Sequence, residues 1–190
     1  RDVLGSRGLG DVYKRQDLSY VRRVILPMGV GEETVKYLKD KKIQPAVEVP
    51  AAIFGGDDAV YNSLVKARKN GISLAAVCSL DGAAIAKKAG MKLCALPGTN
   101  IFNTFSLDEF AHLGFTDAIL STELKIAQCA SLGGKLPRGV FAYGRLPLMQ
   151  TRNCPVKNGT TCDKCRKHGS LTDRMGVTLS LIHISEPTRP

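Results

Sequence analysis

Short apolar runs alternate with amphipathic segments along most of this chain, and this alternation constrains the fold more than any other feature. Each apolar run has the length and continuity of a strand buried on both faces, and each is followed by a segment long enough for a helix. Six such strands are predicted, at residues 22–28, 44–49, 72–79, 91–98, 117–123 and 138–144. Repeated βα units of this kind form a parallel sheet covered by helices.

Capping residues place two of the helix starts. Asp57 or Asp58 is expected to cap the helix after the second strand, and Ser106, with Glu109 three residues later, has the pattern of a capping box. Six βα units are too few to close an eight-stranded barrel, which takes about 250 residues. We therefore predict an α/β fold, the last six units of a (β/α)8 TIM-type barrel whose first two lie upstream. An open doubly wound sheet is the alternative.

The two ends of the chain are related as opposite strands of one DNA element. A DNA strand that encodes Leu179–Arg189 has a reverse complement that encodes Ser6–Gln16. Selection for folding does not produce this relation, and the element is identified as the transposase adapter of a sequencing library. Residues 1–16 and 179–190 are therefore expected not to be native. The natural part is expected to be an internal fragment of a longer protein, with residues 17–149 in the barrel and residues 150–178 in a cysteine-rich loop.

Basic residues outnumber acidic ones, with 27 Lys and Arg against 17 Asp and Glu. The basic residues are densest around the cysteine-rich loop, where they could form either a solvated face or a patch that binds RNA, a small anionic cosubstrate or an acidic peptide. No run approaches the roughly 18 apolar residues of a membrane span. A soluble domain without a membrane partner is therefore expected.

Three of the six cysteines have the surroundings of buried thiols. Cys78, Cys94 and Cys129 lie within apolar segments, where a free cysteine behaves as a small hydrophobic residue. Buried free thiols favour a reducing, cytoplasmic location over an extracellular disulfide scaffold.

The other three cysteines share one turn-rich segment, in the spacing Cys154-x7-Cys162-x2-Cys165, and His168 follows. Such a segment cannot bury an apolar face, so thiolate ligation of a metal is the usual source of its folding free energy. Thiolates favour an iron–sulfur cluster or zinc. A cluster would need a fourth cysteine beyond Thr178, whereas His168 would complete a Cys3His zinc site. A set of free thiols without metal is the third alternative.

Polar residues follow several of the predicted strands, at the positions that line the active face of a barrel. These residues are Glu48, Ser79, Asn100, Asn103, Ser121, Glu123, Tyr143 and Arg145. Glu48, Glu123 and Tyr143 are the catalytic candidates, the two carboxylates as general acid or base, although strand-end carboxylates often bind a helix N-terminus or an arginine instead. Asn100 and Asn103, together with Arg145 and Arg152, are candidates for substrate binding, the arginines through an anionic group.

The second half of the chain resembles a known family. Residues 98–124, 143–155 and 171–176 (GTNIFNTFSLDEFAHLGFTDAILSTEL, YGRLPLMQTRNCP and LTDRMG) are similar to the collagenase-like peptidases of unknown catalytic type, peptidase family U-32. The first half, with RRVILP and PAVEVP, matches more loosely. The resemblance implies a (β/α)8 barrel with a four-cysteine [4Fe–4S] cluster, to which Cys154, Cys162 and Cys165 would contribute.

The resemblance leaves three functions open. Members of the family carry the peptidase name and some are associated with collagen degradation, while others are linked to prephenate-dependent RNA hydroxylation or to oxygen-independent hydroxylation in quinone synthesis. We expect an iron–sulfur peptidase of this family, with an iron–sulfur-dependent RNA hydroxylase and a non-catalytic barrel with structural zinc as alternatives. The peptidase activity rests on family analogy, and the fragment alone is expected to be inactive.

Overall fold

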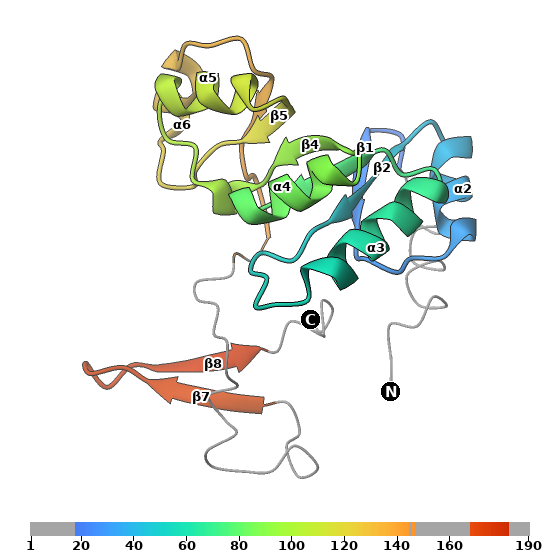
Figure 1. Cartoon of the computed structure of the whole chain (residues 1–190). Coiled ribbons are helices and arrows are strands. Elements are labelled where there is room, and N and C mark those ends of the chain that lie inside the picture. The colour runs from blue at the N-terminus through green and yellow to red at the C-terminus, as the bar shows by residue number, and fades with distance from the viewer. Residues whose placement is uncertain (1–17, 145, 147–167, 183–190) are drawn as a thin grey trace. The chain divides into compact units, whose positions relative to one another are not determined.

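The computed structural model describes residues 18–144, 146 and 168–182 (Figure 1). The chain divides into two compact units with a boundary between Leu146 and Pro147, and each unit is described by itself. The elements of the first unit are β1 (Arg23–Leu26), α2 (Glu32–Asp40), β2 (Gln44–Glu48), α3 (Asp57–Lys69), β3 (Leu74–Val77), α4 (Leu80–Lys88), β4 (Lys92–Ala95), the 3-10 turn η1 (Pro97–Thr99), α5 (Thr104–His112), β5 (Phe115–Ile119), α6 (Ile126–Ser131) and β6 (Arg138–Gly139).

The strands of the first unit form one parallel sheet in the order β1-β2-β3-β4-β5-β6. Each strand pairs with the next strand in the sequence, and each of the five crossovers between them contains an α-helix. The strand order never reverses, whereas a doubly wound sheet requires a reversal. The doubly wound alternative is therefore wrong, and the sheet is a curled half-barrel with the strand order of part of a (β/α)8 barrel.

The sheet has an apolar layer on each face because alternate side chains of a strand point in opposite directions. One face packs against the helices, where Leu26, Val47 and Val77 are buried together with Leu38 of α2 and Leu64 of α3. The other face has a separate cluster of buried side chains, formed by Ala46, Leu74, Ala76, Cys94 and Leu96. This second face is the concave side of the curled sheet, and its buried cluster makes it a packed interior.

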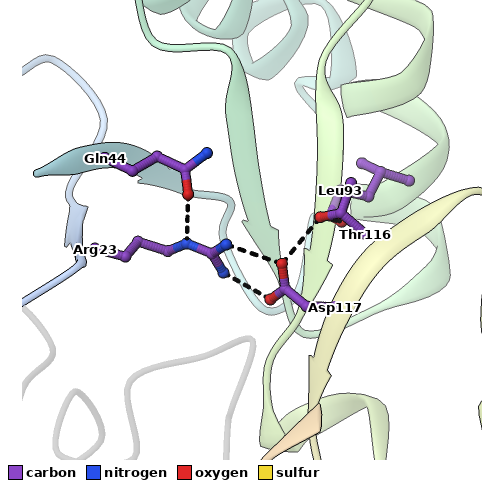
Figure 2. Close-up of polar contacts among 5 residues, drawn as sticks. All are labelled: Arg23, Gln44, Leu93, Thr116 and Asp117. Carbon is purple, nitrogen blue, oxygen red and sulfur yellow. Dashed lines mark hydrogen bonds and ion pairs between the residues drawn. The ribbon is translucent and has the colours of Figure 1, made fainter. Parts of the chain in front are cut away.

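An ion pair joins the first and fifth strands across the concave face (Figure 2). The Arg23 guanidinium donates to both carboxylate oxygens of Asp117, at 2.6 Å and 2.9 Å. Its Nε donates to the Gln44 side chain on β2 at 3.0 Å. In a flat sheet β1 and β5 would lie about 19 Å apart, four strand spacings, which is farther than these two side chains reach together. The ion pair therefore requires the sheet to curl.

Two predicted caps differ from the observed ones. The helix α3 begins after Gly56, which has φ +85°, so Asp57 and Asp58 lie in its first turn and do not cap it. The capping box of α5 is formed by Asn103 and Ser106. Asn103 Oδ1 accepts from the Ser106 N–H at 2.8 Å, and the Ser106 Oγ accepts from the Asn103 N–H at 3.3 Å. The prediction of a Ser106–Glu109 box was wrong because the helix begins earlier, at Thr104.

The last predicted strand is shorter than expected. Pairing with β5 stops at Gly139, so residues 140–144 are not strand. The second unit contains the antiparallel hairpin β7 (His168–Thr172) and β8 (Thr178–Ile182). Residues 179–182 of this hairpin belong to the segment predicted to come from the adapter. Over the ranges that the structure covers, no helix has the length and apolar character to cross a bilayer.

Candidate functional site

The carboxyl edge of the sheet places Glu48 and Cys78 on its concave face. Glu48 ends β2 and is paired in register with Ala76, one of the buried residues of the concave cluster, and Cys78 packs against that cluster. The Glu48 side chain is exposed and the Cys78 side chain is half-buried. A carboxylate that faces solvent and a neighbouring thiol therefore share the edge at which barrel enzymes bind their substrates.

The environment of Cys78 keeps its thiol protonated. Burial raises the pKa of Cys78, the negative charge of Glu48 raises it further, and the backbone N–H of Gly98 acts in the opposite direction. A Cβ placed on Gly98 would lie 2.8 Å from the Cys78 Cβ and 3.3 Å from its Sγ, so only glycine allows this approach. Because thiolates are the nucleophilic form of cysteine, Cys78 is a poor nucleophile at neutral pH. The apolar neighbours of Cys78 in the sequence had indicated only a core position.

Ser121 and Glu123 follow β5 at the same edge. Ser121 is 4% exposed, its N–H donates to the Ile101 carbonyl at 2.9 Å, and its Oγ accepts from the Glu123 N–H at 3.3 Å. These contacts hold the loop after β5, while the Glu123 side chain itself is exposed. Asn100 is exposed with φ +50°, a left-handed conformation that asparagine tolerates better than most residues.

Two of the polar residues at the strand ends cap helices. Ser79 caps α4, where its Oγ accepts from the Gly82 N–H at 3.4 Å, and its hydroxyl lowers the pKa of Asp81 by hydrogen bonding. Asn103 caps α5 through the hydrogen bonds described above. The Asn103 oxygen is thus already paired with the Ser106 N–H, although asparagine at this position had suggested substrate binding.

The remaining predicted site residues are not gathered by the described part of the chain. Tyr143 is 97% exposed, beyond the last paired strand. Arg145, Arg152, Cys154, Cys162 and Cys165 lie outside the described residues, and so does the side chain of His168. Within the residues that are described, no group of three or more His, Cys, Asp or Glu side chains is arranged to hold a metal ion. The metal site remains a prediction.

A polar group on the concave face was missed by sequence reasoning. Arg23 is paired in register with Gln44, and Asp117 is paired in register with Cys94, so charged side chains occupy the amino end of an otherwise apolar interior. The Thr116 hydroxyl lies 3.0 Å from Asp117 Oδ2 (Figure 2). Burial raises the pKa of Cys94 to about 11, and the charge of Asp117 adds to this while Arg23 opposes it.

A signal for this group was present in the strand pattern. Arg23 and Ile25 lie two residues apart in β1, and Asp117 and Ile119 lie two residues apart in β5. Each charged residue therefore shares a face of the sheet with an apolar residue that packs in the concave interior. This polar group lies at the amino end of the strands, whereas the carboxyl edge carries the exposed Glu48 carboxylate and the Cys78 thiol, whose pKa is raised by burial. No family model matches the chain, and neither a curated protein sequence nor a solved structure matches it.

Proposed function

We propose that this chain is part of a (β/α)8-barrel hydrolase of the collagenase-like peptidase family, peptidase family U-32, which cleaves peptide bonds at the carboxyl edge of its sheet. The observation that supports the proposal is the exposed Glu48 carboxylate at the concave carboxyl end of β2. A carboxylate in this position can take a proton from a water molecule that attacks a bound carbonyl carbon. The C–N bond then breaks, and Glu48 passes this proton to the leaving amine, so the carboxylate is restored; Glu123 is a second candidate for these proton transfers.

The protonation state of Cys78 favours Glu48 over the thiol as the reactive group. Burial and the neighbouring carboxylate both raise the pKa of Cys78, so a covalent thiolate mechanism would start from the minor form. A carboxylate that activates water has no such requirement. In this proposal Cys78 shapes the edge beside Glu48, and Asn100 contacts the substrate.

The cofactor is proposed from the chemistry of the donor set. Cys154, Cys162 and Cys165 would provide three of the four thiolates that a [4Fe–4S] cluster requires, and with His168 they would equally suit zinc. A bound cluster would supply electron transfer. A non-catalytic barrel with structural zinc is thus the alternative in which the metal only folds the loop.

The test uses the longer protein that the sequence analysis predicts, prepared anaerobically and assayed on a gelatin or casein substrate. Glu48→Gln should lower kcat by at least about 10²-fold, the usual contribution of a general base, and should leave KM nearly unchanged. Glu109→Gln is the matched control because Glu109 is an exposed carboxylate on α5, away from the carboxyl edge. Cys78→Ser should keep most of the activity.

Full peptidase activity in Glu48→Gln would refute the assigned role. An absence of peptide cleavage by the wild-type protein with its metal in place would refute the function itself. The alternative of iron–sulfur-dependent RNA hydroxylation would then lead, provided that the protein contains iron and labile sulfide and that its deletion removes a hydroxylated RNA base. Stoichiometric zinc with neither activity would favour the structural alternative.

A further inference from the structure

Cations gather at the carboxyl ends of three neighbouring helices, on the side of the sheet opposite the edge that carries Glu48. This basic face consists of eight exposed residues, Lys39, Lys41 and Lys42 at the end of α2, Lys66, Arg68 and Lys69 at the end of α3, and Lys87 and Lys88 at the end of α4. Asp40 is the one acidic residue within these helix ends.

The helix dipole accounts for only part of this charge. A cation near a helix carboxyl end is favourable by up to about 1 kcal/mol, so some lysine is expected there in any parallel βα fold. However, α5 and α6 pack against the same sheet and lack such clusters. The last turn of α5 has His112 as its one basic residue, and the last turn of α6 has none. The fold therefore does not require the cations that α2, α3 and α4 carry.

Within the described part of the chain, no carboxylate forms an ion pair with a cation of the basic face. The ion pairs formed among the described residues are Arg23 with Asp117 and His112 with Glu109. Two of the cations bind backbone oxygens instead, since Arg68 donates to the Ala89 carbonyl at 3.3 Å and Lys87 donates to the Leu113 carbonyl at 3.2 Å. Eight positive charges thus face solvent, and their mutual repulsion is relieved by any bound polyanion.

A groove between α3 and α4 lies within the basic face. These two helices run side by side (Figure 1), and the groove between them has a volume of about 440 Å³. Its lining contains three cations and no carboxylate: Tyr61, Val65, Arg68, Lys69, Lys88, Ala89 and Gly90. The Lys88 ammonium lies 5.3 Å from the centre of the Tyr61 ring. The groove therefore offers several fixed positive groups to a chain of anions.

We propose that the basic face binds the phosphate backbone of a nucleic acid. Repeated phosphates match several separated cations, and neutralising them releases counterions from the nucleic acid. An anionic lipid surface fits less well, because peripheral membrane binding combines cations with inserted apolar side chains. Residues 36–42, 61–71 and 85–92, the segments that carry the basic face, expose no large apolar side chain. The more exposed apolar residues Leu80, Phe105 and Ile126 lie at the amino-terminal ends of helices.

The test measures binding of the full chain to a mixed-sequence RNA hairpin and to a DNA duplex, as a function of salt. Lys69→Glu with Lys88→Glu removes two groove cations and leaves Arg68 on its carbonyl partner. The double variant should lower the slope of log affinity against log salt by about 2 for the duplex, and should weaken binding by about 50-fold at roughly 0.1 M salt. Lys125→Glu with Lys135→Glu makes the same change in net charge outside the groove and should have a much smaller effect.

A loss of affinity confined to Lys69→Glu with Lys88→Glu would support the basic face as the binding site. Circular dichroism and thermal unfolding of both double variants ensure that only folded proteins are compared. An equal loss of affinity in the two double variants would mean that net charge alone attracts nucleic acid, and the basic face would be refuted as a site. Binding to vesicles of anionic lipid as tight as to either nucleic acid, and equally sensitive to Lys69→Glu with Lys88→Glu, would replace the proposed partner by a membrane surface. The proposal is independent of peptidase activity, because the readout is binding alone.

Discussion

The ion pair between Arg23 and Asp117 should make a measurable contribution to stability, and its loss would test the curl of the sheet. Asp117→Asn removes one charge and leaves the Arg23 guanidinium facing an amide on the concave face. The two side chains are 31% and 22% exposed, and they make two hydrogen bonds of 2.6 Å and 2.9 Å. The pair is therefore neither a free surface pair nor a fully buried one.

The magnitude follows from this intermediate exposure. Exposed ion pairs contribute about 0–1 kcal/mol, and breaking a buried pair costs about 3–5 kcal/mol. With 31% and 22% of the two side chains in solvent, we expect Asp117→Asn to lower the free energy of unfolding by about 2 kcal/mol. Arg23→Gln should lower the free energy of unfolding by a similar amount. The double variant should lose about 1–2 kcal/mol less than the sum of the two single losses, and this difference is the coupling energy of the pair.

The assay is urea unfolding, followed by far-UV circular dichroism, of the wild type, the two single variants and the double variant. Arg22→Gln provides the matched control, because Arg22 is the exposed residue immediately before β1 and forms no ion pair among the described residues. Its combination with Asp117→Asn should be additive within about 0.3 kcal/mol. A coupling between Arg23 and Asp117 that is no larger than this control would show that the side chains do not meet, and the half-barrel interior described above would be wrong.

Three further predictions follow from single residues. Asn103→Ala should lower the free energy of unfolding by about 1 kcal/mol, measured by urea unfolding, because it removes the cap that holds the Ser106 N–H; no change would mean that the cap does not form. The pKa of Cys94 is raised to about 11 in the folded state, so the Cys94 thiol contributes to the free energy of unfolding. This contribution is complete below the unfolded pKa of about 8.5 and falls by about 3 kcal/mol as the pH rises towards 11. Stability measured between pH 8 and 11 should therefore fall less in Cys94→Ala than in the wild type, and equal slopes would contradict the raised pKa. Cys78 should react slowly with a thiol reagent at pH 7.5, and Glu48→Gln should speed the reaction because it removes a charge that raises the pKa of Cys78; an unchanged rate would mean that the two groups do not interact.

Local pattern was sufficient to predict the parallel βα architecture. Continuous apolar runs such as residues 72–79 have one stable environment, the interior of a sheet covered on both faces, and helical spacing between the runs requires crossovers. Strand β3 is accordingly buried at all four positions. Burial of Cys94 and Cys129 and half-burial of Cys78, all three as free thiols, followed from their apolar neighbours in the same way. Helix starts were predicted less well, because several residues near Asn103 can cap and backbone geometry selects among them.

The sequence by itself determined which segments are strands and helices, because hydrophobic periodicity is a local property that each segment carries alone. Only the tertiary structure decided that the sheet curls in a single direction, that Arg23 meets Asp117 across it, and that Cys78 lies beside Glu48 and Gly98. It also placed the cations of α2, α3 and α4 side by side. These contacts join residues that are far apart in the chain, and their distances depend on strand order and sheet curvature, which no local pattern encodes.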